Sequence, residues 1–469
     1  MKRLNNIYKY LFLAWPAVLY FSYFPVIGIG ANETMNFEFS LALIYLVFFD
    51  LVAVALMIKE KKLGFFFKNK YWFLYPIFAT VSILWSLNTT RGILTCGVMW
   101  LLLIAGMSIV SFKKTVLKNT WNNLKKVIYI SAGVAVLWCV IQCILDLCGV
   151  GREVTLLCEG CTKEMFGFPH PNGFAIEPQF MGNLLIAPAL IAASSFVNRI
   201  ANSKSQLKRS RGDSFYNGSV GVLFTFGIFL TFSRGAIYAF VVGILLLIGY
   251  EIIKNKNVKS LLLVPVVLFS FLISLGMQGI MAANSGLGET FDSGVAKVLN
   301  QLSLGVIDFR AKPDESKPDE FRPDETKVNE QKPEPVFDGY VAESTDTRVR
   351  LNNAAIEIWK KNLNTMLVGV GVGGAGQALY NNELSPAPKE IVQNEYFSVL
   401  LETGVMGAVL FVFTIGMAFY VVWKKSDAKF VIVIMIAYGI TLFFFSGYPN
   451  ALHIYLLPVM MAATYKKAP

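Results

Sequence analysis

Charged residues and histidine are both scarce in this chain. Of its 469 residues, 16% are charged and two are histidine, whereas 55% are hydrophobic. This balance, with a mean hydropathy of +0.54, excludes an ordinary soluble globular protein. The net charge of +11 does not by itself indicate nucleic acid, because cytoplasmic loops of membrane proteins collect lysine and arginine.

Familiar nucleotide-binding and hydrolytic motifs are also missing from the sequence. It contains no Walker A loop, no dinucleotide-binding fingerprint in a βαβ context, no H-E-x-x-H and no G-x-S-x-G. A glycine-rich run at residues 369–374 does not lead into G-K-[ST]. The sequence therefore argues against nucleotide binding.

Long apolar runs recur along nearly the whole chain, each long enough to cross a bilayer as a helix. We predict an all-α polytopic transmembrane bundle of about twelve spans. The first run follows Lys2 and Arg3 as a signal sequence would, but it is long and lacks a clear cleavage site, so we interpret it as a retained span. The predicted spans are residues 11–30, 39–58, 71–87, 93–112, 127–148, 178–197, 216–232, 235–253, 261–281, 402–423, 430–447 and 450–465.

The distribution of basic residues predicts the orientation of this bundle. If the N-terminus is cytoplasmic, the inside connections carry the lysine clusters, whereas the short outside connections carry only Arg91, Arg152, Lys163 and Arg234. Since cytoplasmic loops are enriched in lysine and arginine, both termini are expected inside. The chain then divides into spans one to nine (residues 1–281), a large extracytoplasmic loop between spans nine and ten (282–395), and spans ten to twelve (396–469).

The predicted extracytoplasmic loop has two parts of different character. Residues 311–335 form a degenerate five-residue repeat of proline and charged residues, which cannot continue a helix or bury a core, so we expect a disordered or extended spacer. Residues 347–364 instead predict a helix, because their apolar residues recur at helical spacing. A tight glycine turn is expected at residues 368–374.

Two of the six cysteines, Cys158 and Cys161, form a C-x-x-C in a predicted outside loop. In that location a disulfide is favoured over a cytosolic redox pair. A metal site needs more ligands than this pair and the neighbouring His170 would supply, so we predict none.

Arginine stands out among the basic residues predicted to face outward. Arg234 separates two apolar runs, and Arg348 and Arg350 lie at the start of the predicted loop helix. A guanidinium offers a planar, permanently charged fork that suits phosphate, and a helix N-terminus adds partial positive charge. This pattern favours an anionic ligand such as a lipid diphosphate. An alternative is that Arg234 only caps a hairpin or contacts lipid headgroups.

Two titratable residues lie before the predicted span at 178–197. Glu177 could act as a general base for a sugar hydroxyl, with burial raising its pKa, or could simply pair with an arginine. His170 could serve as the base instead. The structural alternative is an ordinary loop histidine among prolines.

Four segments together resemble one family of bacterial envelope enzymes. They are T-F-S-R-G-A at residues 231–236; the segment 166–183 with its P-N and E-P pairs; an arginine (Arg348 or Arg350) followed by an amphipathic helix and a G-x-G turn; and N-E-Y at 394–396 leading to L-E-T-G-V-M-G at 401–407. In order and sidedness they are similar to the O-antigen ligase / O-antigen polymerase superfamily of membrane glycosyltransferases.

The resemblance implies a metal-independent glycosyltransferase of the cytoplasmic (inner) membrane with an extracytoplasmic active site. Its donor would be a glycan on polyprenyl (undecaprenyl) diphosphate, and neither a nucleotide sugar nor another cofactor would be required. The resemblance assigns the diphosphate to Arg234 with one or both of Arg348 and Arg350, and the glycan or phosphate to Arg152. Asn172, Gln393 and Asn394 would orient sugar.

One departure from the family pattern bears on the activity. Many members have histidine where this chain has Gln393, and that histidine is implicated in ligase-like members. We therefore expect a polysaccharide polymerase, with Glu177 or His170 as base. Ligation of finished glycan to a lipid or protein acceptor is the near alternative. Expected partners are the lipid-linked oligosaccharide, a glycan acceptor, the bilayer, a chain-length regulator and a flippase, but no nucleic acid.

A transporter of lipid-linked sugars is an alternative from another class. It would be expected to show an internal repeat between its halves and a central charged path. The sequence shows no such repeat, and its polar cluster is on one side.

Overall fold

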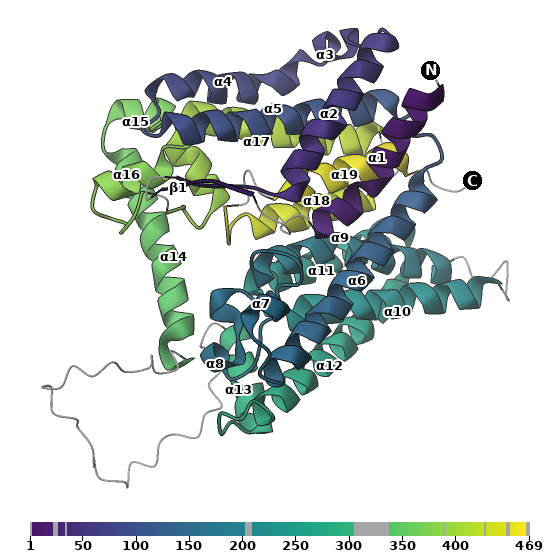
Figure 1. Ribbon diagram of the computed structural model, residues 1–469. Coiled ribbons are helices and arrows are strands. Elements are labelled where there is room, and N and C mark those ends of the chain that lie inside the picture. Colours follow the sequence, from purple (N-terminus) through teal and green to yellow (C-terminus); the bar gives the residue numbers. More distant parts are fainter. Residues whose placement is uncertain are drawn as a thin grey trace, which may run out of the picture.

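The computed structural model describes residues 2–21, 27–32, 35–201, 209–303, 337–388, 390–425, 428–446 and 451–465 (Figure 1). Its described part is mainly helical, as predicted. The departure from an all-α fold is a short antiparallel hairpin of β1 (Ile27–Asn32) and β2 (Met35–Phe39). The predicted spacer at residues 311–335 lies outside the described residues.

Within the described residues, seven helices are long and apolar enough to cross a membrane. They are α2 (Leu41–Lys59), α5 (Thr89–Phe112), α6 (Trp121–Leu147), α9 (Pro178–Ala201), α11 (Arg234–Asn255), α12 (Leu263–Ala283) and α17 (Glu395–Lys425). Three further helices have shorter apolar stretches: α10 (Arg209–Leu230), α18 (Phe430–Thr441) and α19 (Leu452–Thr464). A multi-pass helical membrane protein is thus supported, whereas the count of twelve spans is not confirmed.

Two predicted spans differ from the helices that the structure contains. Residues 11–30 are not one helix, because α1 (Lys2–Tyr20) ends early and β1 follows, with Ile27 opposite Phe39. Residues 71–87 divide into η1 (Lys70–Phe73), α4 (Leu74–Ser82) and η2 (Ile83–Trp85). Pro76 accounts for the first of these breaks, since proline lacks the N–H that would continue a helix and fits the first turn of a new one.

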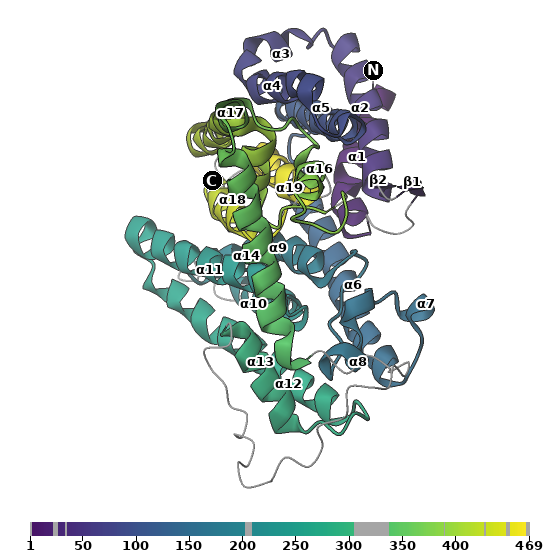
Figure 2. The same cartoon turned by 90° about the vertical axis from the view of Figure 1, so that its left-hand side faces the viewer.

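Two groups of helices pack side by side (Figures 1 and 2). In Figure 1 the upper group contains α1, α2, α4, α5, α17, α18 and α19, and the lower group contains α6, α9, α10, α11 and α12. Helix α18 joins the groups, because it packs on α9 and α11 as well as on α17 and α19.

The outer faces of several long helices are apolar. Leu245 of α11, Leu268 and Phe269 of α12, and Val409 and Phe413 of α17 are all exposed. Water would make such continuous apolar faces unfavourable, whereas the hydrocarbon of a bilayer covers them. The surface therefore agrees with the membrane location that the composition indicates.

Short helices lie beside one end of this bundle. They are α7 (Arg152–Thr155), η3 (Glu159–Cys161), α8 (Lys163–Phe166), α13 (Phe291–Leu302), α15 (Leu363–Val368) and α16 (Ala375–Asn381), in addition to the longer α14 (Phe337–Lys360). In Figure 1, α14 to α16 lie at the left, whereas α3 (Gly64–Lys68), from a lysine-rich connection, lies at the upper right. The remaining short helix, η4 (Val258–Leu262), leads into α12.

Candidate functional site

Arg234 is the first residue of α11 and is largely buried, with 9% of its surface exposed. The chain turns sharply before it, since Phe232 has a positive φ of 60°, and the Ser233 hydroxyl caps the helix by accepting a hydrogen bond from the Ala236 N–H at 3.4 Å. The guanidinium therefore projects from a helix N-terminus, where the helix dipole adds positive charge. This placement suits an anionic group.

Tyr238 is a residue near Arg234 that the sequence analysis missed. It lies one helical turn further along α11, close enough for the Arg234 charge to act on its phenol. Its ring packs near that of Phe444 at 6.1 Å between centroids. The i, i+4 spacing from Arg234 is the signal that could have identified it, because residues four apart share a helix face.

Glu177 and Arg348 come from distant parts of the chain, yet the Arg348 charge is close enough to act on the Glu177 carboxyl group. Glu177 immediately precedes α9, and Arg348 belongs to α14. Glu177 is an exposed residue, but protein atoms around its carboxyl group desolvate it and raise its pKa above the ordinary value, and the Arg348 guanidinium opposes part of that rise. A carboxyl group with a raised pKa is a better proton acceptor near neutral pH than an ordinary one.

The segment that follows α18 links Arg234 to Glu177. A Cβ atom added to Gly235, beside Arg234, would lie 2.8 Å from the Phe444 side chain. The Phe444 carbonyl also accepts a hydrogen bond from Gln179 Nε2 at 3.3 Å, two residues after Glu177. The starts of α9 and α11 thus contact the same short segment at one end of the bundle.

His170 lies inside an aromatic cluster. Its ring stacks on Phe166 at 4.0 Å and lies 5.0 Å from the ring of Phe232, and only 6% of the residue is exposed. Burial lowers the pKa of His170 to about 3. An imidazole with so low a pKa is a weak base at neutral pH, so this environment favours the structural alternative for His170.

Asn172 holds the loop before α9 together. Its amide nitrogen donates to the carbonyl oxygens of Leu156 (3.2 Å) and Ala175 (2.5 Å). Gln142 Nε2 donates to the Asn172 Oδ1 atom at 3.4 Å, and Asn172 is only 3% exposed. The polar atoms of Asn172 thus hold the loop together, and its role in orienting sugar stays a prediction.

The other predicted substrate residues divide into exposed and inward positions. Arg350 is exposed on α14, and Arg152 is exposed on α7. Figure 2 shows α7 at the right-hand edge and α14 near the middle of the molecule. Gln393 is half-buried directly before α17, and Asn394 caps that helix by accepting from the Tyr396 N–H at 3.0 Å. The site residues thus remain predictions, with Asn394 having a clear structural role.

The predicted glycine turn at residues 368–374 is present and is forced by close backbone contacts. Gly369, Gly371 and Gly373 all have positive φ. The turn passes between the start of α5 and α17, where the Gly371 N–H donates to the Glu402 carbonyl oxygen and the Val372 carbonyl accepts from the Ser86 hydroxyl. Helix α17 itself breaks at Gly404, which has φ 61° and packs against Leu367 just before the turn.

Cys158 and Cys161 form a disulfide, as the C-x-x-C predicted. It lies in the loop that leads to His170, whose backbone N–H donates to the Cys161 carbonyl oxygen at 2.8 Å.

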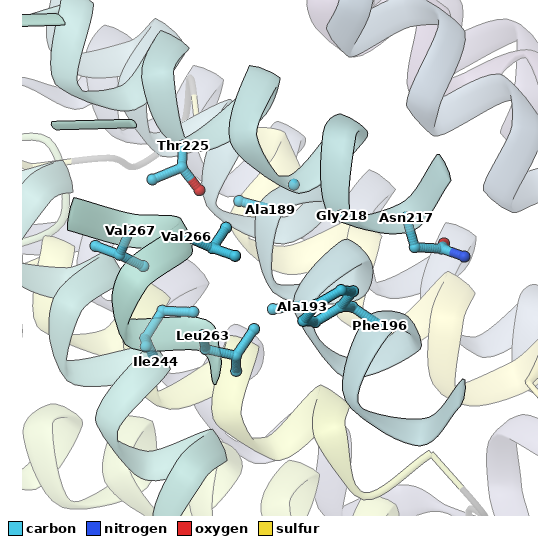
Figure 3. Close-up of a pocket in the computed structure, with 11 residues that line it drawn as sticks. Ala189, Ala193, Phe196, Asn217, Gly218, Thr225, Ile244, Leu263, Val266 and Val267 are labelled. Atoms are coloured by element: carbon cyan, nitrogen blue, oxygen red, sulfur yellow. The ribbon is translucent and has the colours of Figure 1, made fainter. Parts of the chain in front are cut away.

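A hollow between α9, α10, α11 and α12 is lined mainly by apolar side chains (Figure 3). Small and aliphatic side chains such as Ala189, Ala193 and Val266 line it, with Asn217 at its edge, where the Lys125 amine donates to the Asn217 amide oxygen at 3.1 Å. Its lining includes none of the predicted site residues, so it plays no part in the candidate site.

Residues 219–412 match the family model described as O-antigen ligase. The match includes Arg234, Arg348 and Gln393, whereas Glu177 and His170 precede it. No curated protein matches the chain.

Proposed function

Through residues 219–412 this chain belongs to the O-antigen ligase / O-antigen polymerase superfamily, and from that premise we propose that it is a polysaccharide polymerase. Its donor is a glycan on polyprenyl diphosphate, and transfer takes place at the outer face of the cytoplasmic membrane. The observation that supports this proposal is that the Arg348 charge acts on Glu177, with Arg234 at the start of α11, which contacts the same short segment as the start of α9.

In the proposed reaction, an acceptor hydroxyl attacks the anomeric carbon of the donor glycan. Glu177 accepts the hydroxyl proton as the new glycosidic bond forms, and the bond between the anomeric carbon and the diphosphate oxygen breaks. The departing lipid diphosphate keeps the electron pair. Arg234 and Arg348 stabilise its growing negative charge, because preorganised cations in a site of low polarity act strongly on developing charge.

Glu177 suits the role of base better than His170 does. It is an exposed residue, and desolvation of its carboxyl group by surrounding protein atoms raises its pKa. His170 is enclosed by phenylalanine rings, and its pKa of about 3 keeps it neutral but weakly basic. Arg350 is exposed on the same helix as Arg348 and contributes attraction for the diphosphate at longer range.

Ligation of finished glycan to another acceptor is the second candidate function. The description of the matching family favours it directly. Gln393 favours polymerisation instead, because the histidine implicated in ligase-like members is replaced here by an amide that cannot accept a proton near neutral pH.

Deletion of the gene in its host separates the two functions. A polymerase mutant displays a single repeat unit on its surface glycolipid, whereas a ligase mutant accumulates lipid-linked polymer and displays none. Gel separation of surface glycans together with analysis of extracted lipid-linked oligosaccharides distinguishes these outcomes. Normal polymer in both fractions would contradict the proposed function altogether.

A further inference from the structure

Exposed lysines gather at one end of the bundle, where the connection between α2 and α4 meets the connection that follows α5. They come from two stretches of the chain, residues 59–70 and 113–118, and are Lys59, Lys61, Lys68, Lys70, Lys114 and Lys118. In Figure 1, α3 and the start of α1 lie at the right, whereas α14 to α16 lie at the left. We propose that this basic surface binds the headgroups of anionic phospholipids, a role that goes beyond the proposed glycosyl transfer.

Lys62 holds the two stretches of the basic surface together. Its amine donates a hydrogen bond to the Thr115 hydroxyl at 3.2 Å and lies 4.4 Å from the centre of the Phe112 ring, at the end of α5. The same amine pairs with Glu60 Oε2 at 2.7 Å. Glu60 is the only acidic residue of the two stretches, so their one negative charge is already paired with a lysine. The exposed lysines therefore leave a strong net positive charge at this end.

Apolar side chains border these lysines. Phe65 and Phe66 of α3 pack against the core of the bundle, whereas Phe67 is 82% exposed and Leu63 is 41% exposed. Lys68 directly follows Phe67, so an exposed ring and an exposed amine are neighbours in the chain. At the boundary of a bilayer such a ring lies among the acyl chains while the amine reaches the headgroups. The composition of α3 therefore fits a membrane interface better than water.

The residues that follow α3 continue from this interface into hydrocarbon. Tyr71 and Trp72 of η1 are half-buried, with their ring centroids 6.0 Å apart. Tyrosine and tryptophan are enriched where a membrane meets water. Helix α4 follows, with Leu74 and Ile77 exposed. Along the chain, lysines are thus followed by aromatic rings and then by an apolar face, which is the order of the layers from headgroups to acyl chains.

The charge and the apolar border together indicate the ligand. Clusters of lysine beside a transmembrane helix attract anionic lipids, and each lysine near the surface increases affinity by roughly fivefold. An acidic surface of another protein would meet the same charge. The exposed Phe67 and Leu63, however, require an apolar partner next to the anionic one. A phospholipid supplies both in one molecule, because its acyl chains adjoin its phosphate.

The basic surface lies at the opposite end of α5 from the glycine turn. Phe112 is the last residue of α5, whereas Gly92 lies in its first turn, where an added Cβ atom would be 2.6 Å from the Val372 carbonyl oxygen. Substitution of exposed lysines at the basic surface should therefore leave the candidate site unchanged. Lipid binding can also be measured without a glycan substrate, so its outcome is independent of the proposed function.

The test uses the full-length protein in detergent and two lipid probes, phosphatidylglycerol and phosphatidylcholine, each with a fluorophore on one acyl chain. Energy transfer from the tryptophans of the protein reports binding, and the ratio of the two affinities reports selection of the anionic headgroup. Lys61→Gln combined with Lys68→Gln should lower this ratio by about fivefold for each lysine removed.

Lys254→Gln combined with Lys256→Gln is the matched control. These lysines are exposed at the end of α11, on the same predicted side of the membrane, and the change in charge is the same. Each pair also contains one lysine with a positive φ, Lys61 in the first and Lys256 in the second. The control pair should retain the wild-type preference for phosphatidylglycerol.

Phe67→Ser separates contact with acyl chains from recognition of the headgroup. It should weaken the binding of both probes equally and leave their ratio unchanged, because the two lipids have the same acyl chains. Lys114→Gln combined with Lys118→Gln repeats the measurement on the second stretch if the first pair fails to fold. A wild-type ratio in the folded variants, or an equal loss in the control pair, would overturn the inference. Equal binding of the two lipids by the wild-type protein would also overturn it and would leave an acidic protein as the partner to seek.

Discussion

Substitution of Gly371 by alanine tests the close packing of the glycine turn on the start of α5. Gly371 has φ 86°, and a Cβ atom added there would lie 2.3 Å from Ser86 Cα and 2.7 Å from the Ser82 carbonyl oxygen. Left-handed backbone costs an L-residue about 1–2 kcal/mol, and overpacking against a rigid neighbour costs about 1–3 kcal/mol. The two contributions together predict a destabilisation of about 2–5 kcal/mol.

The measurement is the free energy of unfolding in detergent, with glycan extension followed in parallel. Gly106→Ala in α5 is the control, because an added Cβ atom there meets nothing within 4 Å. Alanine inside a helix should be neutral or stabilising by about 1 kcal/mol relative to glycine. If Gly371→Ala were as stable as Gly106→Ala, the close packing of the glycine turn on the start of α5 would be refuted.

Three further substitutions test the roles of individual side chains. Arg234→Ala should abolish glycan extension while the protein remains at normal abundance. Arg234→Lys should also be impaired, because lysine lacks the bidentate guanidinium fork. Glycans of wild-type length on a gel would show that Arg234 is not part of the mechanism. Arg348→Gln should shift the acid limb of the pH–rate profile to higher pH, because Arg348 lowers the pKa of Glu177 and the base acts in its deprotonated form. An unchanged acid limb would show that Arg348 does not act on the base. His170→Phe should retain activity and pH profile, since its neighbours are aromatic, whereas loss of transfer at normal abundance would restore His170 as the base.

The sequence predicted most helices because length and apolarity are local properties. The start of α11 at Arg234 was predicted because a charged residue there separates two apolar runs. The glycine turn at residues 368–374 was predicted because its glycines are closely spaced. The hairpin of β1 and β2 was not foreseen, because the apolar run that includes residues 27–30 satisfies the length of a span as well as that of a strand. The apolarity of a run of residues does not by itself distinguish a transmembrane helix from a strand.

The candidate site was predictable as a set of residue types but not as an arrangement. The electrostatic influence of Arg348 on Glu177 involves residues far apart in sequence, and one sequence alone contains no record of such proximity. The hydrogen bonds that the Asn172 amide makes within its loop could not be predicted from the sequence, because hydrogen-bond partners depend on the fold. Arg91 was recognised as an outward arginine, but its proximity to Glu402 required the turn that brings α5 and α17 together.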